Sequence, residues 1–330
     1  MATRENILFI RLKSIGDVLF TLPAVHAVRE NFPSARLHFL VSREHASLLR
    51  GFADIDEVIT LDRKIYGSGN FVSAARNTFR LLHGLRQPQF SRTLDFQGYG
   101  ETAFLSWWTG APERWGSVYQ PTRGWAYTRG IPRDITAHPA DGSLALLRDC
   151  GLKIGPVSNE YILPEDALAE ARRFFAEHKL DAAKPTLFLQ PFTSTPKKDW
   201  PLENFLKLAW HWHSQGGQVI FGGGPGDRAA LESARAAGFP VSAGVPLLVT
   251  GGLMKLSALV VGGDTGLLHM AVAMGRRVVM LMRSNRKGNL GGQTFPFQHP
   301  DWALMAASGQ PVSSVEISTV IAATTRALGC

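Results

Sequence analysis

Cysteine is scarce in this sequence. The 330 residues include two, Cys150 and Cys330, which are far apart and outside any CxxC spacing. These two residues cannot build a disulfide scaffold or a cysteine-based zinc site. This low cysteine content fits a protein of a reducing compartment best.

The sequence also lacks the segments that carry a chain into or across a membrane. Its first residues lead straight into a strand-like run, NILFIRL, without the longer apolar segment and small-residue cleavage site of a secretory signal. No stretch reaches the roughly 20 apolar residues that span a bilayer. We therefore expect a cytoplasmic protein, with peripheral association at the inner membrane left open.

Acidic residues are fewer than basic ones, 27 Asp and Glu against 35 Lys and Arg, which gives a formal net charge of +8. Such a balance favours anionic partners, for example phosphorylated sugars or an anionic membrane surface. The sequence has neither a block of Lys and Arg nor basic residues beside clustered stacking aromatics, so nucleic acid is not expected as a partner.

What the sequence does contain is a regular alternation of strand-like and helical segments. In the first half, NILFIRL, ARLHFLV, DEVITL and RTLDFQG alternate with amphipathic segments, one of them near residues 71–85. In the second half, PTLFLQPF, QVIFGGG, LSALVVGGD and RRVVMLM alternate with further helical segments. This alternation predicts two doubly wound, Rossmann-like α/β domains, each with a parallel sheet covered by helices on both faces.

The segment PEDALAEARRFFAEHKLDAAKP is typical of a helix followed by a polar connector. It places the predicted domain boundary near residue 180, with an N-terminal domain over 1–180 and a C-terminal domain over 181–330. A closing helix, VEISTVIAATTRALG, belongs to the second domain or packs back on the first. In open α/β sheets ligands bind beyond the carboxyl ends of the strands, so motifs that directly follow strands are the candidate site.

The first such motif is SIGD, in the turn after NILFIRL. Gly16 gives this turn conformational freedom, and Asp17 begins the following helix. Asp17 is either a helix cap or a carboxylate that reaches a bound substrate, and position alone favours the cap. The loop has no GxGxxG, so the dinucleotide fingerprint of a dehydrogenase is absent.

The second motif, GGDTGLLH, follows the strand-like LSALVV and opens an apolar helix. Its glycines permit close backbone approach, Asp264 or Thr265 caps the helix, and the first amides, among them those of Gly266 and Leu267, point at whatever precedes it. This is an anion site, and the charge of Asp264 favours a ligand with hydroxyls and phosphate, such as a nucleotide sugar. His269 shares a helix face with Thr265, although a helical His among apolar residues is more often a packed one.

The third motif, QPFTSTPKKDWP, follows the strand TLFLQ. Hydroxyls of Thr193, Ser194 and Thr195 and the ammonium groups of Lys197 and Lys198 suit a phosphate. A capped surface turn with solvated lysines is the alternative.

A weaker motif, FGGGPGDR, could approach a nucleoside, with Asp227 on a ribose hydroxyl; such loops are common in doubly wound folds. Trp210 and Trp212 are interpreted as packing residues.

Three segments, IRLKSIGDVLFTLPAV, KKDWPLENF and GGDTGLLHMAVAMG, occur in this order and together resemble glycosyltransferase family 9, the ADP-heptose:lipopolysaccharide heptosyltransferases. The resemblance covers most of the chain. It implies a GT-B fold, in which two Rossmann-like domains face a cleft, an inverting mechanism, and no divalent metal or other cofactor. The implied substrates are ADP-heptose as donor and a lipid-linked oligosaccharide of the lipopolysaccharide inner core as acceptor.

The resemblance also assigns roles to residues. It implies that Asp17 is the general base for the acceptor hydroxyl and that Lys198 stabilises charge on the departing diphosphate. The other implied donor contacts are Thr193 and Ser194 to phosphate, Asp264 to heptose hydroxyls, and Thr265, Gly266, Leu267 and His269 around the phosphate.

Arg63 and Lys64, after EVITL, are candidates for acceptor phosphates, with solvated surface charge as the more common role. A sugar-nucleotide epimerase or hydrolase and a non-catalytic nucleotide-sugar-binding protein are the alternative functions.

Overall fold

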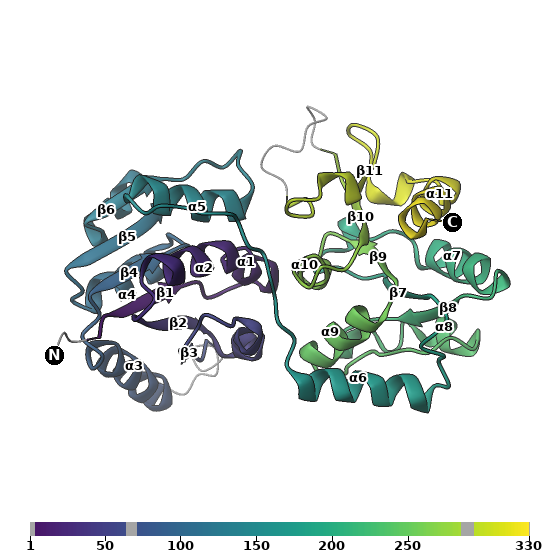
Figure 1. The fold of residues 1–330 in the computed structure, drawn as a ribbon, viewed down its shortest axis with the longest axis horizontal. Helices are drawn as coiled ribbons and strands as arrows, with labels where there is room; N and C mark the ends of the chain where they lie inside the picture. Colours follow the sequence, from purple (N-terminus) through teal and green to yellow (C-terminus); the bar gives the residue numbers. More distant parts are fainter. Residues whose placement is uncertain (1–3, 64–70, 285–293, 330) are drawn as a thin grey trace. The chain divides into compact units, whose positions relative to one another are not determined.

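The structure, a computed structural model, describes residues 4–63, 71–284 and 294–329. Its contacts divide the chain into two units, Met1–Glu160 and Tyr161–Cys330, and each is described by itself (Figure 1). This division falls earlier than the boundary expected near residue 180. The reason lies in helix α6 (Glu165–Glu177), which packs on α9 (Leu247–Leu256) in the second unit, where Gly252 lets the two helices approach closely beside Ala171.

The first unit is built around a six-stranded sheet in the order β3-β2-β1-β4-β5-β6, and all its pairings are parallel. Its strands are β1 (Asn6–Ile10), β2 (Arg36–Ser42), β3 (Glu57–Leu61), β4 (Arg92–Asp95), β5 (Glu113–Val118) and β6 (Arg129–Pro132). Its helices are α1 (Ile15–Leu19), α2 (Leu22–Asn31), α3 (Phe71–Arg86), α4 (Gly100–Trp108) and α5 (Pro139–Asp149), with the 3-10 helices η1 (Arg43–Gly51) and η3 (Pro121–Ala126).

The second unit has a five-stranded parallel sheet in the order β11-β10-β9-β7-β8. Its strands are β7 (Thr186–Gln190), β8 (Gln218–Phe221), β9 (Leu259–Gly263), β10 (Val278–Met282) and β11 (Ala303–Met305). Its remaining helices are α7 (Leu202–Ser214), α8 (Glu232–Ala236), α10 (Gly266–Ala273) and α11 (Ile317–Leu328), with the 3-10 helices η4 (Pro196–Lys198), η5 (Pro225–Asp227), η6 (Pro300–Trp302) and η7 (Val312–Ser314).

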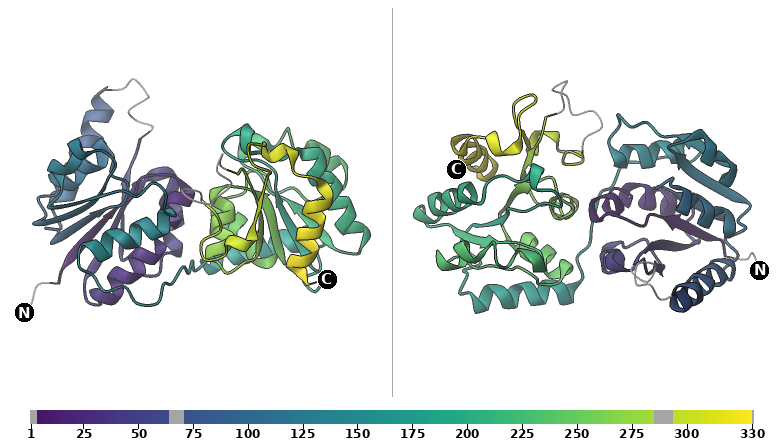
Figure 2. Two further views of the ribbon diagram at one scale, coloured as in Figure 1. Left: turned by 90° about the horizontal axis from the view of Figure 1, so that it is seen from above. Right: turned by 180° about the vertical axis from the view of Figure 1, so that it is seen from behind.

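Helices cover both faces of each sheet, as predicted (Figure 2). The central strands read as continuous apolar runs because both of their faces are buried. In the second unit, Leu187 and Leu189 of β7 point to the core shared with α7 and α11. The closing helix α11 therefore contributes to the core of the second unit through Val320.

Local details differ from the sequence-based expectations. The helix expected to run through Asn31 is two helices, α1 and α2, and Pro23 lies in the first turn of α2. Strands β5, β6 and β11 and helices α4, α5 and α9 were not expected. Among the described residues, no helix combines the length and the hydropathy needed to span a bilayer.

Candidate active site

In each sheet, the direction in which successive strands are added reverses once. The predicted motifs lie at these two points of reversal. The chain runs outward from β1 to β2 and β3 and then returns to place β4 on the other side of β1. In the second sheet it runs from β7 to β8 and then returns to place β9 on the other side of β7. Such switch points, at the carboxyl ends of the strands, are where α/β sheets bind ligands.

Asp17 lies at the switch point of the first unit, in the first turn of α1. The N-cap of α1 is Ser14, so Asp17 is not the capping residue considered from the sequence; one of its carboxylate oxygens accepts a 3.0 Å hydrogen bond from the Ser14 backbone amide. The other oxygen lies 2.7 Å from a guanidinium nitrogen of Arg11. About a third of the Asp17 side chain, 35%, remains exposed, so the carboxylate is both fixed and reachable.

Arg11 follows the last residue of β1 and is nearly buried. Its second guanidinium nitrogen donates a 2.6 Å hydrogen bond to the carbonyl of Phe96, just after β4. Arg133 contacts the same carbonyl at 3.4 Å, and burial, followed by the nearby charge of Arg11, lowers the pKa of Arg133. Asp17 is therefore the counter-ion in a small cationic group at the β1–β4 junction.

The segment after β4 is held by Asp95, which is completely buried. Its carboxylate accepts hydrogen bonds from the amides of Gln97 and Gly98, at 2.9 and 3.0 Å, and from the Tyr127 hydroxyl at 2.7 Å. Burial raises the pKa of Asp95, and the same hydrogen bonds oppose the rise. Gln97 in turn accepts from the Leu12 amide, so the loops after β1 and β4 are tied together.

Asp264 is the centre of the switch point in the second unit. One of its carboxylate oxygens lies 2.7 Å from the Lys198 ammonium. The other lies 3.1 Å from His269 Nε2 and accepts a 2.8 Å hydrogen bond from the Thr294 hydroxyl. Asp264 thus joins two other predicted donor-binding residues, Lys198 and His269.

The environment of Asp264 favours its charged form. Burial alone would raise the pKa of this carboxyl, but the hydrogen bonds and charges of His269 and Lys198 hold it well below its usual range. His269 is almost fully buried, as expected of a packed histidine, and its Nε2 faces Asp264.

The loop between β7 and α7 is shaped by its neighbours. Trp200 is buried and donates from its indole to the carbonyl of Val315, which anchors the end of the loop two residues after Lys198. At the other side, Gly263 of β9 is so close that a Cβ atom there would lie 2.6 Å from the Thr193 methyl and 3.2 Å from the Lys198 carbonyl. The two motifs of the second unit therefore form one surface.

Helix α10 starts at this surface, with Thr265 as its N-cap accepting from the Leu268 amide at 3.4 Å. The amides of Gly266 and Leu267 lie in the same first turn, where the positive end of the helix dipole favours an anion. Ser194 is exposed in the neighbouring loop.

The other predicted residues lie apart from these contacts. Asp227 accepts a 2.7 Å hydrogen bond from the Gly224 amide within its own turn. Arg63 lies 3.4 Å from Glu101. Lys64 is outside the described residues. The ribose and acceptor roles of these residues stay predictions.

Two residues of these contacts, Arg11 and Thr294, were not predicted from the sequence. Arg11 is part of the segment IRLKSIGD, and an arginine directly after a strand is a signal that could have been used. Thr294 follows β10 without a motif of its own, and only the tertiary structure brings it to Asp264.

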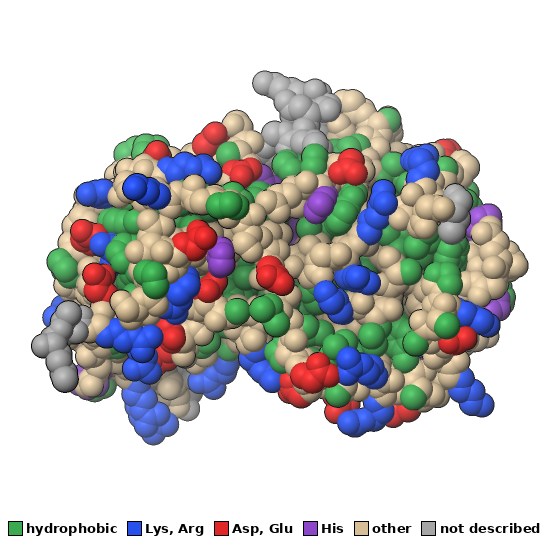
Figure 3. All heavy atoms as spheres, in the orientation of Figure 1, with side chains coloured by type: hydrophobic (Ala, Val, Ile, Leu, Met, Phe, Trp, Pro, Cys, Tyr) green, Lys and Arg blue, Asp and Glu red, His purple; other side chains and the backbone are tan. Residues whose placement is uncertain are grey.

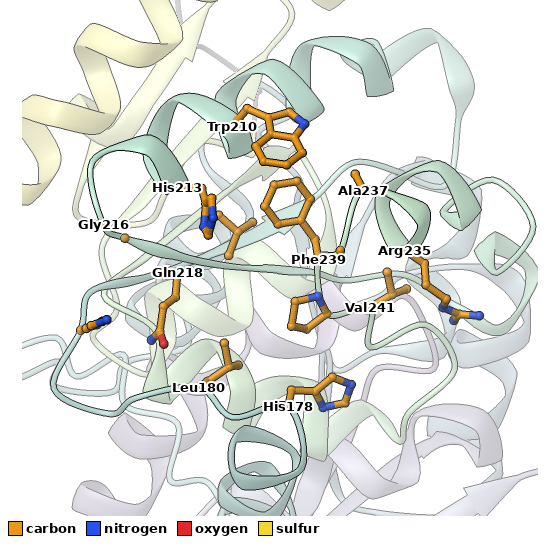
Figure 4. Close-up of a pocket in the computed structure, with 15 residues that line it drawn as sticks. His178, Leu180, Trp210, His213, Gly216, Gln218, Arg235, Ala237, Phe239 and Val241 are labelled. Carbon is orange, nitrogen blue, oxygen red and sulfur yellow. The ribbon is translucent and has the colours of Figure 1, made fainter.

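A separate pocket of about 800 Å³ lies at the other end of the second sheet (Figure 4). It is formed by turns that precede strands, with Trp210, Phe239 and His213 on one side and His178 on another. Trp210 is 49% exposed there, so the prediction that it is a packed residue was wrong, whereas Trp212 is buried as predicted.

The family model of glycosyltransferase family 9 (heptosyltransferase) matches residues 78–310, more than half of the chain. Among curated proteins, the chain is 24% identical over 290 residues to lipopolysaccharide core heptosyltransferase OpsX of Haemophilus influenzae, covering 84% of the chain and 78% of that protein. It is 23% identical over 298 residues to lipopolysaccharide heptosyltransferase 1 of Escherichia coli K12, covering 87% of the chain and 90% of that protein.

Solved structures agree on the fold. A glycosyltransferase of family 9 from Veillonella parvula superposes with a TM-score of 0.85 at 19% identity, over 99% of this chain and 98% of that one. Escherichia coli heptosyltransferase WaaC, solved with ADP, gives 0.78 at 20% identity, over 98% and 99%. A UDP-GlcNAc 2-epimerase from Methanocaldococcus jannaschii gives 0.55 at 11% identity, over 98% and 93%. The predicted α/β fold of the GT-B class is confirmed.

Proposed function

The chain belongs to glycosyltransferase family 9, and on that premise we propose that it transfers a heptose from ADP-heptose to an inner-core acceptor of lipopolysaccharide with inversion at the anomeric carbon. The observation that carries the proposal is the Asp17 carboxylate, which is partly exposed at a switch point and fixed by Arg11 at 2.7 Å. Its relatives of known name are lipopolysaccharide heptosyltransferases, which supports this choice of sugar and acceptor.

In the proposed reaction, an acceptor hydroxyl oxygen attacks the anomeric carbon of the donor. The bond from that carbon to the phosphate oxygen breaks, ADP departs with the bonding electron pair, and the hydroxyl proton passes to the Asp17 carboxylate. The attack from the side opposite to ADP inverts the anomeric configuration. Arg11 holds the carboxylate in one orientation during this step.

The second unit is proposed to hold the donor. Lys198 and the first amides of α10 would bind the diphosphate, and they would stabilise the negative charge that grows on it as the bond breaks. Thr193 and Ser194 would add hydroxyl contacts, and Asp264 would accept from heptose hydroxyls. Because these groups supply the charge stabilisation, the proposal needs neither a divalent metal nor a further cofactor.

Replacing the base is the direct test. Asp17→Asn removes the proton acceptor while preserving the shape of the side chain, and we expect transfer to fall by about 10² to 10⁴-fold. The matched control is Asp134→Asn, at an exposed aspartate of the same unit whose carboxylate accepts hydrogen bonds from Thr136. ADP release in the presence of acceptor is measured beside the melting temperature. Wild-type transfer by a folded Asp17→Asn protein would show that the base is another group.

A nucleotide-sugar epimerase or hydrolase is the second candidate, because an epimerase shares the fold at a TM-score of 0.55. Such an enzyme would consume the donor without any acceptor, whereas a non-catalytic binding protein would not consume it at all. Incubation with ADP-heptose alone and then with acceptor, followed by product analysis, separates the three functions. Thermal stabilisation by ADP-, UDP- and GDP-sugars identifies the donor class.

The proposed acceptor is linked to lipid, so we also propose that the protein acts in the cytoplasm at the inner face of the membrane. The net charge of +8 is favourable for peripheral contact with anionic lipid. Nucleic acid is not among the proposed partners.

A further inference from the structure

The first unit exposes a set of large apolar side chains on α3, α4 and η3. They are Val72 and Phe79 of α3, Phe104 and Trp107 of α4, and Trp125 of η3, which we call the α3–α4 surface. Val72, Phe79 and Trp125 are 80%, 71% and 59% exposed. Soluble proteins seldom gather so many exposed aromatic side chains without a binding partner.

Ring contacts join the aromatic side chains of α4 and η3. Trp107 packs edge-on against Trp125, with ring centroids 5.8 Å apart, and makes a tilted contact with Phe104 at 5.9 Å. Phe104 also lies 5.9 Å from Trp108, whose ring carries the Arg86 guanidinium 4.9 Å above it. The apolar groups of α4 and η3 thus connect, through Trp108, to the end of α3.

Helices α3 and α4 are locked together beneath the surface. The Trp108 indole donates to the Leu82 carbonyl at 2.8 Å, and Arg86 donates back to the Trp108 carbonyl at 3.0 Å. The backbone beneath the exposed rings is therefore held in place by these hydrogen bonds. Binding of a partner would not have to order this part of the chain.

The charges around the surface are mainly positive. Helix α3 contains no acidic residue and carries Arg76, Arg80 and Arg86 at exposed positions. Figure 3 shows basic side chains projecting where α3 lies in Figure 1. The one acidic residue of α4 and η3 is Glu101, which lies 3.4 Å from Arg63. Tryptophan and arginine side by side match the interface of an anionic bilayer, where amphipathic rings lie at the level of the headgroups.

We propose that the α3–α4 surface docks the protein on an anionic lipid bilayer, with the aromatic rings in the interface and the arginines on lipid phosphates. The proposal rests on the proposed function in one respect, because a lipid-linked acceptor gives the enzyme a reason to bind a membrane. The surface lies on the unit to which acceptor activation was assigned. Docking would thereby keep that unit close to the layer that contains the acceptor.

Vesicle binding tests the proposal directly. The full-length protein should sediment with vesicles of phosphatidylcholine and phosphatidylglycerol, bind much less to phosphatidylcholine alone, and dissociate as salt is added. A lack of binding to the anionic vesicles at low salt would overturn the proposal.

Two variants test the residues. Trp107→Gln with Trp125→Gln should weaken binding to the anionic vesicles by at least about tenfold, whereas Trp210→Gln, at an exposed tryptophan of the second unit, should not. Lipids with brominated acyl chains should quench the fluorescence of the wild type and of Trp210→Gln, and should quench the double variant less. Equal binding by the wild type and the double variant would contradict the proposal.

The arginines have their own matched pair. Replacing Arg76 and Arg80 by Gln should cost about fivefold in binding per arginine. Arg172→Gln with Arg173→Gln removes two exposed arginines of α6 that are paired with Glu165 and Glu170, and should leave binding unchanged. Comparable losses in both sets would mean that net charge alone, and not this surface, drives association.

Transfer assays separate this proposal from the proposed function. With a water-soluble acceptor that lacks acyl chains, the tryptophan double variant should match the wild type, and it should be slower with the same acceptor embedded in vesicles. A wild type that binds vesicles but transfers nothing would refute the function and leave docking intact. A second copy of the chain is the competing occupant: a concentration-dependent dimer that the tryptophan double variant abolishes would overturn membrane docking.

Discussion

The carboxylate of Asp17, the proposed base, is paired with Arg11. One guanidinium nitrogen of Arg11 contacts Asp17, and the other donates to the Phe96 carbonyl just after β4. Arg11 therefore links the position of the carboxylate to the end of β4. We expect Arg11→Met to lower kcat by about tenfold or more with a small effect on the KM of the donor, because orientation of the base and not donor binding is lost.

Arg114→Met is the control for this prediction, since Arg114 also donates to backbone carbonyls of the first unit, those of Ala126 and Ala111. Arg11→Lys should recover part of the rate. If a folded Arg11→Met protein keeps the wild-type kcat, the pairing does not position the base.

Asp264 makes a pH-dependent contribution to stability. Its pKa is lower in the folded protein than in the unfolded chain, so its stabilising effect is present above the ordinary Asp value of about 3.9 and is lost as the pH falls below it. We expect Asp264→Asn to lower the free energy of unfolding by about 2 kcal/mol at pH 7. Urea unfolding at a series of pH values should show the difference from the wild type narrowing on the acid side. A difference that is constant with pH would mean that the charge of Asp264 is not what stabilises the fold.

Strand β9 brings its last residue so close to the loop after β7 that a side chain does not fit. Gly263→Ala would place a methyl group 2.6 Å from the Thr193 methyl, so the loop that carries Lys198 must shift. We expect the dissociation constant of the donor to rise about tenfold, with the overall fold retained. Gly142→Ala, in helix α5 with no atom near the added methyl, is the control. Donor titration by calorimetry measures the effect, and equal affinities for the two variants would contradict it.

At the level of elements, the strands that are buried on both faces were the easiest to predict from the sequence. Strands β1, β2, β7 and β9 are buried along nearly their whole length and are mostly apolar, so their pattern is visible in the sequence. Strand β6, Arg129–Pro132, escaped because it is an edge strand with mostly exposed side chains. The Arg11–Phe96 contact joins residues 85 apart in the sequence, and only the neighbouring position of β1 and β4 creates it. The ordered motifs singled out Asp17 and Lys198 as candidate site residues. The contacts of Arg11 and Thr294 could be found only from the tertiary structure.

On the scale of the whole chain, the second unit has a hydrophobic core of its own. Its core uses both sheet and helices of residues 161–330, and all the proposed donor contacts belong to it. We expect residues 161–330, expressed separately, to unfold cooperatively and to bind ADP. Differential scanning calorimetry with and without ADP provides the test, and a fragment without a cooperative transition would show that the first unit is required for folding.

The presence of a switch point in each unit has a consequence for how such enzymes diversify. On the proposed assignment, the choice of acceptor is encoded around Asp17 and the choice of nucleotide sugar around Lys198 and Asp264, in units with separate cores. Substitutions that retune one preference need not destabilise the other. The architecture is therefore modular, and exchanging one unit between relatives is a rational route to new pairings of sugar and acceptor.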